Sequence, residues 1–274
     1  MSEARTLVDD LGARVPLAGP PRRLVSLVPN LSELLAHVGL GDRLVAVTEY
    51  CVLPADGFPS ARRVRGTKNP DVAAIAALAP DLVLANEEEN RALDVERLRA
   101  AGIAVHVTRV RSLADLPASL ARLAEVLDVT ERVAGLLAEL RSLPPAPRAT
   151  GPRVACAVWR DDPRRGGDEE GWWLLGRDTY GASVIAAAGG ALVPDDPTGR
   201  YPRAPLGELR ALAPAVVLLP DEPYAFGAVD VAELAAVGLV GVPVDGRALW
   251  WWGHRTPSAV RALTSMLAAV AAGQ

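Results

Sequence analysis

The two halves of the chain carry similar stretches in the same order, which limits the folds open to it. Each stretch of the first half has a counterpart 130–136 residues further along the chain. Three segments that keep their order and spacing indicate a duplicated α/β unit, although generic strand–helix units can also look alike by chance. The matched stretches are RLVSLVPN (23–30) with RVACAVWR (153–160), ALAPDLVLANEEE (77–89) with ALAPAVVLLPDEP (211–223), and LRAAGIAVHV (98–107) with LAAVGLVGVPV (234–244).

Within each half, short apolar runs alternate with stretches of helical periodicity. Short apolar runs between helices are typical of strands in a parallel sheet that helices cover on both faces. The sequence therefore predicts an α/β fold with two similar lobes. We expect strands at 23–28, 43–48, 81–85, 103–107, 153–158, 215–219 and 240–244, and helices at 32–38, 72–78, 93–101, 182–188, 206–212, 231–237 and 256–272.

The segment 113–143 differs from the rest because leucine and valine recur along it at helical spacing. This pattern predicts about 30 helical residues, up to roughly 45 Å long, with a possible break near 128–130. The run PPAP at 144–147 ends it. The predicted organisation is an N-terminal α/β lobe at 1–112, an interlobe helix at 113–143 and a C-terminal α/β lobe at 144–274.

Composition excludes several classes of partner. The formal charge of −4 provides no basic surface for nucleic acid. No apolar run reaches the roughly 18 residues that span a bilayer, so we expect no membrane insertion. The N-terminus has no positively charged head and no apolar core, which predicts a cytoplasmic location; a trimmed N-terminus would make a periplasmic or membrane-anchored location the alternative. Cys51 and Cys156 are expected to be buried thiols, with a disulfide left open.

The twelve aromatic residues fall outside the predicted core helices and cluster after strands. Ligands of parallel α/β sheets bind beyond the carboxyl ends of the strands, and aromatic rings stack well on broad apolar ligands. About half of the rings, including Phe58, Trp172 and Phe226, are expected to fix loops to the lobes instead. The aromatic candidates for ligand contact are Tyr50, Trp159, Tyr180, Tyr201, Trp250, Trp251 and Trp252.

Polar residues share these loops. Arg160 and Arg255 could clamp a carboxylate or phosphate of a ligand, with a surface ion pair as the alternative for Arg160. His254 follows the three tryptophans and is a candidate metal ligand. The acidic run 87–89 suits a cationic ligand or partner, or simply a solvated face. The further ligand-binding candidates are Thr67, Lys68, Asn86 and Glu88.

Signals for catalysis are weak. The sequence has no G-x-S-x-G, no H-E-x-x-H and no phosphate-binding G-x-x-x-x-G-K-[ST] motif. His37 falls on a predicted helix and His106 in a predicted strand, so both are expected to be structural. We therefore expect a protein that is not an enzyme and has no intrinsic cofactor.

Two long stretches resemble a known family. RLVSLVPNLSELLAHVGLGDRLVAVTEYCVLP and GTKNPDVAAIAALAPDLVLANEEENR are similar to the opening and middle segments of the helical backbone metal receptors. This substrate-binding family includes periplasmic cobalamin, haem and ferric-siderophore binders. The resemblance covers the chain from about Arg22 to Ala271, and GTKNP and EENR resemble its cobalamin-binding branch.

The resemblance implies two lobes, a rigid interlobe helix and a ligand held between the lobes. That ligand would be a large metal chelate: cobalamin or another corrinoid, haem, or a ferric siderophore. By position, Tyr50 and the turn 66–69 would face it from the first lobe, and Trp159 and residues 250–255 from the second. The expected partner is this small molecule, and the chain is expected to be a monomer.

Two departures from the family argue against docking on an ABC permease. Members that serve importers are exported, whereas this N-terminus shows no signal. Such members also carry an acidic residue on each lobe, where this chain has Ala73 and Gly207, with Glu208 one residue away. The alternatives are a cytoplasmic enzyme acting on a corrinoid or tetrapyrrole precursor, and an ABC-importer receptor whose export signal is missing from the sequence.

Overall fold

The computed structural model describes residues 5–144, 151–161, 171–196 and 199–273. The chain divides into two compact units, and each is described by itself below. The first comprises residues 1–110 and 115–141, and the second comprises residues 111–114 and 142–274. Among the described residues, no helix is both long enough and apolar enough to cross a membrane.

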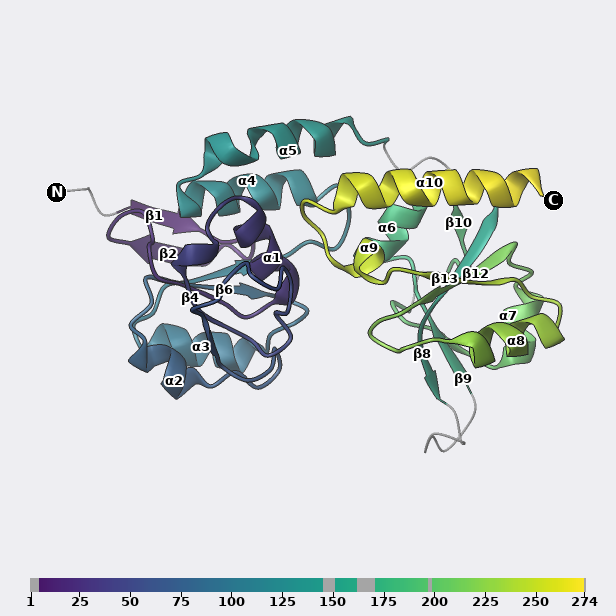
Figure 1. The fold of residues 1–274 in the computed structure, drawn as a ribbon, viewed down its shortest axis with the longest axis horizontal. Coiled ribbons are helices and arrows are strands. Elements are labelled where there is room, and N and C mark those ends of the chain that lie inside the picture. The colour runs from purple at the N-terminus through teal and green to yellow at the C-terminus, as the bar shows by residue number, and fades with distance from the viewer. Residues whose placement is uncertain (1–4, 145–150, 162–170, 197–198, 274) are drawn as a thin grey trace. The chain divides into compact units, whose positions relative to one another are not determined.

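The first unit is built on a parallel sheet in the order β5-β4-β3-β6-β7. Figure 1 shows α2 and α3 on one face of this sheet and α4 on the other. The strands are β3 (Leu24–Ser26), β4 (Leu44–Val47), β5 (Arg62–Arg63), β6 (Leu82–Asn86) and β7 (Val105–Thr108), beside an antiparallel hairpin of β1 (Arg5–Val8) and β2 (Arg14–Leu17). The helices are α1 (Pro29–His37), the 3-10 turn η1 (Gly41–Arg43), α2 (Val72–Ala77), α3 (Ala92–Ala100), α4 (Leu116–Leu127) and α5 (Thr130–Ser142).

The second unit repeats this plan and adds antiparallel strands. Its sheet runs β11-β9-β8-β12-β13, with β10 also paired to β8. The strands are β8 (Arg153–Asp161), β9 (Gly171–Leu174), β10 (Ala191–Leu192), β11 (Arg203–Ala204), β12 (Val216–Pro220) and β13 (Gly241–Val244). The helices are α6 (Tyr180–Ala187), α7 (Leu206–Ala211), α8 (Ala228–Ala236), α9 (Arg247–Trp250) and α10 (Thr256–Ala272). The pairing of β9 with β8 was not expected, because the short run around Trp172 reads as a connection.

The two halves that are similar in sequence are also similar in structure. Arg23, before β3, donates from Nη2 to the carbonyl of Leu78 at 2.6 Å, and Arg153, at the start of β8, donates in the same way to Leu212 at 2.6 Å. The residues that follow these two leucines both have positive φ, 44° and 45°. The prediction of two similar α/β lobes with parallel sheets is therefore confirmed.

The segment 113–143 forms two helices and not one straight rod. Asp128 lies between α4 and α5 in the left-handed conformation, with φ 59° and ψ 47°, so the break falls where the sequence allowed one. At 1.5 Å per residue, each helix is roughly 20 Å long. Arg132 of α5 donates to the carbonyl of Val38, next to α1, at 3.0 Å. Residues 115–141 thus pack within the first unit.

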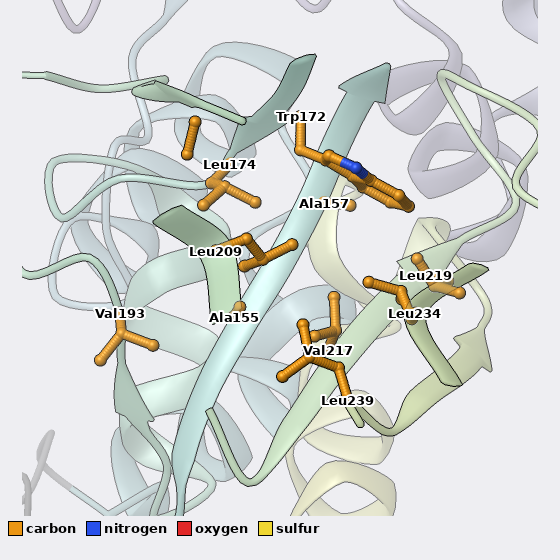
Figure 2. Packing of buried hydrophobic residues seen from close by; sticks show 11 residues of the cluster. Ala155, Ala157, Trp172, Leu174, Val193, Leu209, Val217, Leu219, Leu234 and Leu239 are labelled. Atoms are coloured by element: carbon orange, nitrogen blue, oxygen red, sulfur yellow. The ribbon is translucent and has the colours of Figure 1, made fainter. Parts of the chain in front are cut away.

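One core cluster of the second unit lies between its sheet and helices α7 and α8. Figure 2 shows side chains of β8, β9, β12 and both helices pointing into one cluster. Trp172 is fully buried there, beside Ala157, Leu219 and Leu234. Burying a large aromatic ring against aliphatic side chains contributes strongly to stability. Trp172 therefore holds β9 against this core cluster. The expectation that Trp172 fixes a loop to its lobe agrees with this placement.

In the first unit, a buried charge cluster attaches the β1–β2 hairpin. Asp9 Oδ2 accepts a hydrogen bond from Arg99 Nη2 at 2.7 Å, and Asp10 Oδ1 accepts one from Arg122 Nε at 2.7 Å. His106 on β7 is fully buried beside them, and neither ring nitrogen has a hydrogen-bond partner among the described residues. Burial lowers the pKa of His106, with Asp10 and Asp9 opposing and Arg122 and Arg99 reinforcing that shift.

We predict that His106 makes the fold acid-sensitive. Its pKa is lower in the folded state than the unfolded value near 6.5, so its neutral form favours folding at neutral pH, and that contribution is lost as the pH falls below about 6.5. The slope from one such group is at most about 1.4 kcal/mol per pH unit. Urea unfolding from about pH 7.5 to about pH 5.5 should show a flatter pH dependence for His106→Leu. Equal slopes for His106→Leu and the wild type would contradict the prediction.

Candidate functional site

In the second unit, a row of aromatic rings runs from the core to the surface at the carboxyl ends of β8 and β12. Trp172 stacks on Phe226 with ring centroids 5.8 Å apart and planes at 4°. Phe226 contacts Tyr224 at 4.6 Å, and Tyr224 meets Trp159 edge to face at 5.2 Å and 74°. Trp159 ends the row with 47% of its surface exposed. This aromatic row (Trp159, Tyr224, Phe226 and Trp172) gives Trp159 a fixed ring partner although it faces solvent.

Arg160 is not placed to clamp a ligand, and that prediction is corrected. Its side chain is only 1% exposed, and it donates to Asp230 Oδ1 at 2.8 Å and to Glu233 Oε1 at 2.5 Å, both on α8. Its guanidinium carbon also lies 4.8 Å from the centre of the Trp172 ring. Burial acts to lower the pKa of Arg160, but the hydrogen bonds to Glu233 and Asp230 outweigh it and raise that pKa. The ion pair foreseen as the alternative exists, but it is buried and not on the surface.

A second group of side chains surrounds Glu222, directly after β12. The Glu222 carbonyl accepts a hydrogen bond from Trp250 Nε1 at 2.7 Å, and its carboxylate accepts one from the Trp251 side chain. The guanidinium carbon of Arg247 lies 5.6 Å from the centre of the Trp251 ring. Burial raises the pKa of Glu222, with Arg247 opposing. We call Glu222, Arg247, Trp250 and Trp251 the Glu222 rim.

The three consecutive tryptophans do not act alike. Trp250 ends α9, so the run is not an extended strand with alternating sides. Trp250 and Trp251 are partly exposed, whereas Trp252 is buried. Trp252 therefore differs from its two neighbours and belongs to the core, so its assignment to the ligand site is corrected.

Of the other two aromatic candidates in this unit, one is buried and one is exposed. Tyr180 is buried at the start of α6, and its hydroxyl is 2.8 Å from Thr256 Oγ1. Burial raises the pKa of Tyr180, which is a property of a core phenol, so its assignment to the ligand site is corrected. Tyr201 is exposed, and the guanidinium carbon of Arg200 lies 5.8 Å from its ring centre.

His254 and Arg255 connect α9 to α10 and are partly exposed. Arg255 precedes the first residue of α10. Within the described parts of the chain, no three His, Cys, Asp or Glu side chains gather in a way that could hold a metal ion. A role of His254 as a metal ligand stays a prediction. Cys51 and Cys156 are free and buried, and burial raises the pKa of both thiols.

In the first unit, Tyr50 follows β4 and is the exposed ring of that unit's carboxyl edge, with 63% of its surface accessible. A Cβ at Gly66 would lie 3.0 Å from the Tyr50 ring, so the absence of a side chain there lets the ring lie on the backbone. The next residue, Thr67, is buried, and its carbonyl accepts a hydrogen bond from Asn90 Nδ2 at 2.9 Å. The turn beneath Tyr50 is thus fixed from the loop after β6.

The loop after β6 is shaped by its own asparagine. Asn86 is buried, and its Oδ1 accepts the backbone N–H of Glu88 at 2.9 Å while its Nδ2 donates to Thr108 Oγ1 at 3.2 Å. Lys68 donates from Nζ to the carbonyl of Glu88. An asparagine that accepts a hydrogen bond from the backbone two residues later is a turn-forming residue. Asn86 and Lys68 therefore shape this edge of the sheet. In the sequence, only their position in polar loops indicated a role at the site.

The fold is similar to that of known binding proteins. The structure aligns with the periplasmic vitamin B12 binding protein BtuF of Vibrio cholerae at a TM-score of 0.72 and 21% identity, over 92% of this chain and 98% of that one. It aligns with the apo periplasmic haem-binding protein RhuT of Roseiflexus sp. RS-1 at a TM-score of 0.73 and 23% identity, over 91% and 99% of the two chains. At these identities the likeness shows a shared fold.

The chain belongs to the periplasmic binding protein family, whose model matches residues 24–223. Its resemblance to the helical backbone metal receptors is confirmed. Relatives by sequence include the vitamin B12-binding protein of Vibrio vulnificus (strain YJ016), 32% identical over 111 residues, or 40% of each chain. That of Pectobacterium carotovorum subsp. carotovorum (strain PC1) is 33% identical over 104 residues, or 38% of this chain and 37% of the relative. These matches span less than half the length of the relatives.

We predict that Arg160 is needed for the fold of the second unit. Arg160→Met leaves Asp230 and Glu233 without their buried counter-charge, which should lower the free energy of unfolding by about 3–5 kcal/mol. Replacing both acids as well, in Arg160→Met/Asp230→Asn/Glu233→Gln, should recover most of that loss. Urea unfolding of the two variants measures the loss of stability and its recovery. An Arg160→Met protein as stable as the wild type would show that the ion pairs contribute little.

Proposed function

We propose that the protein binds a large metal chelate, such as a corrinoid, haem or a ferric siderophore, and carries out no chemistry on it. The observation that carries this proposal is the exposed Trp159 ring, fixed at the carboxyl edge of β8 by its edge-to-face contact with Tyr224. A preformed exposed ring suits stacking on a broad, partly apolar ligand. Membership of a family of binding proteins supports a role without catalysis.

Tyr50 extends the proposal to the first unit. It is an exposed aromatic ring on a backbone turn that Asn90 fixes, at the carboxyl edge of that unit's own sheet. We propose that the carboxyl edge of each unit's sheet takes part in ligand binding. Names of relatives that mention vitamin B12 and haem support this ligand class.

The family's description also bears on location and partners. The expectation of a cytoplasmic protein finds no support among these relatives, which are periplasmic binding proteins. We therefore propose the periplasmic or membrane-anchored location that stood as the alternative. Ala73 and Gly207 stand where importer-serving members carry acidic docking residues. We therefore propose that the protein does not use such acidic residues to dock on an ABC permease. We also propose that it is a monomer.

The proposal predicts that single exposed rings control affinity. Trp159→Ala and Tyr50→Ala should each weaken binding by roughly 5- to 150-fold, because a stacked ring contributes on the order of 1–3 kcal/mol. Calorimetric titration with cyanocobalamin, dicyanocobinamide, haem and a ferric siderophore measures this loss. The melting temperature should change little, since both rings lie at the surface and outside the core.

Trp252→Ala is the matched control, since the same kind of ring is removed from a buried position. It should lower the melting temperature clearly. If Trp159→Ala and Tyr50→Ala both bind every probe as the wild type does, the exposed rings are not the binding surface. If the wild type binds none of the probes, the ligand class is wrong.

A further inference from the structure

Glu222 places a carboxylate among the tryptophans of the second unit. It follows β12, and its backbone and side chain both accept hydrogen bonds from indole rings, from Trp250 and Trp251 respectively. Its side chain is 32% exposed. A carboxylate offers about four lone-pair sites, so the Trp251 bond leaves acceptor capacity on the exposed part of the group.

The position of Glu222 is closely fixed. A Cβ at Gly246 would lie 2.6 Å from Glu222 Cγ and 2.8 Å from its carbonyl oxygen, so the side chain lies directly against the backbone after β13. The Gly246 N–H donates to Asp221 Oδ1 at 2.8 Å, which holds the two loops together. The carboxylate is therefore set in one place before any ligand arrives, and preorganised groups lose little entropy on binding.

The charges around this carboxylate are mostly negative. Burial is the main cause of the raised pKa of Glu222. Arg247 is the strongest charge that opposes this shift, and Asp221 and Asp245 add smaller contributions that raise the pKa. Arg247 Nε lies 3.7 Å from Glu222 Oε2, and its guanidinium also lies over Trp251. Glu222, Asp221 and Asp245 thus bring three acids to one place, together with one arginine. Such a site attracts N–H donors and repels carboxylates on a ligand.

We infer that Glu222 makes the site selective for chelates whose rim carries amide N–H groups, against chelates of the same shape that carry carboxylates. This inference rests on the proposed function and adds a substrate class to it. The aromatic rings would bind either kind of macrocycle, because stacking does not depend on rim charge. Glu222 would then separate the two kinds by hydrogen bonding and charge.

Two corrinoids with the same ring test the inference: dicyanocobinamide, which carries amides, and dicyanocobyrinic acid, which carries carboxylates. Calorimetry at low ionic strength measures both on the wild type and on Glu222→Gln, which keeps the size and removes the charge. The wild type should prefer the amide form. In Glu222→Gln, affinity for the acid form should rise about fivefold, as expected for a partly exposed charge, and affinity for the amide form should not rise.

Glu96→Gln is the matched control, because Glu96 is an exposed acid on α3 of the first unit. It changes the net charge equally and should leave the preference unchanged. An equal gain in Glu96→Gln would attribute the effect to net charge and overturn the inference. So would an unchanged preference in a Glu222→Gln protein whose circular dichroism and melting temperature match the wild type.

The outcomes also separate this inference from the proposed function. If the wild type binds both corrinoids but Glu222→Gln keeps the same preference, the proposed function stands and the role of Glu222 falls. If the wild type binds neither corrinoid nor haem, both fall together.

Discussion

The ion pairs of Arg160 hold the aromatic row of the second unit to its core. The guanidinium is buried against the Trp172 ring and is held by Asp230 and Glu233 on α8. Asp230 also accepts the N–H of Gly227 at 2.8 Å, at the start of that helix. Because a buried charge is tolerated only when it is paired, this contact fixes β8 against α8. The preceding residue of the strand is Trp159, which is thereby presented at a defined place on the surface.

In the first unit, an uncharged side chain fixes the backbone beneath the exposed ring. Asn90 donates to the carbonyls of Leu27 and Thr67, and so joins the loops that follow three strands. Tyr50 rests on the turn held in this way. In both units a buried polar side chain fixes the backbone, and an exposed ring lies beside it. This arrangement keeps the rings available for a ligand without making them part of the core, which is why affinity and stability should respond separately to mutation.

The fold could be predicted from the sequence because its signals are local and repeated. Alternating strands and helices gave the parallel sheets, and the break at Asp128 fell within the region where helical periodicity weakened. The site was only partly predictable, because burial depends on contacts between distant segments. Arg160 and Tyr180 look like loop residues until α8 and Thr256 cover them. Glu222 was missed because nothing in its local sequence shows that two indole rings lie against it.

The central claim is that the exposed rings at the carboxyl edge of each unit's sheet bind the ligand. Hydrogen exchange of the backbone, measured by mass spectrometry with and without dicyanocobinamide, tests it most directly, because it locates the ligand without any mutation. The account predicts slower exchange at 48–52, 64–69, 221–226 and 250–255, and unchanged exchange in α2, α3 and α7. Slower exchange confined to those helices, with the edge loops unaffected while the ligand is bound, would contradict it.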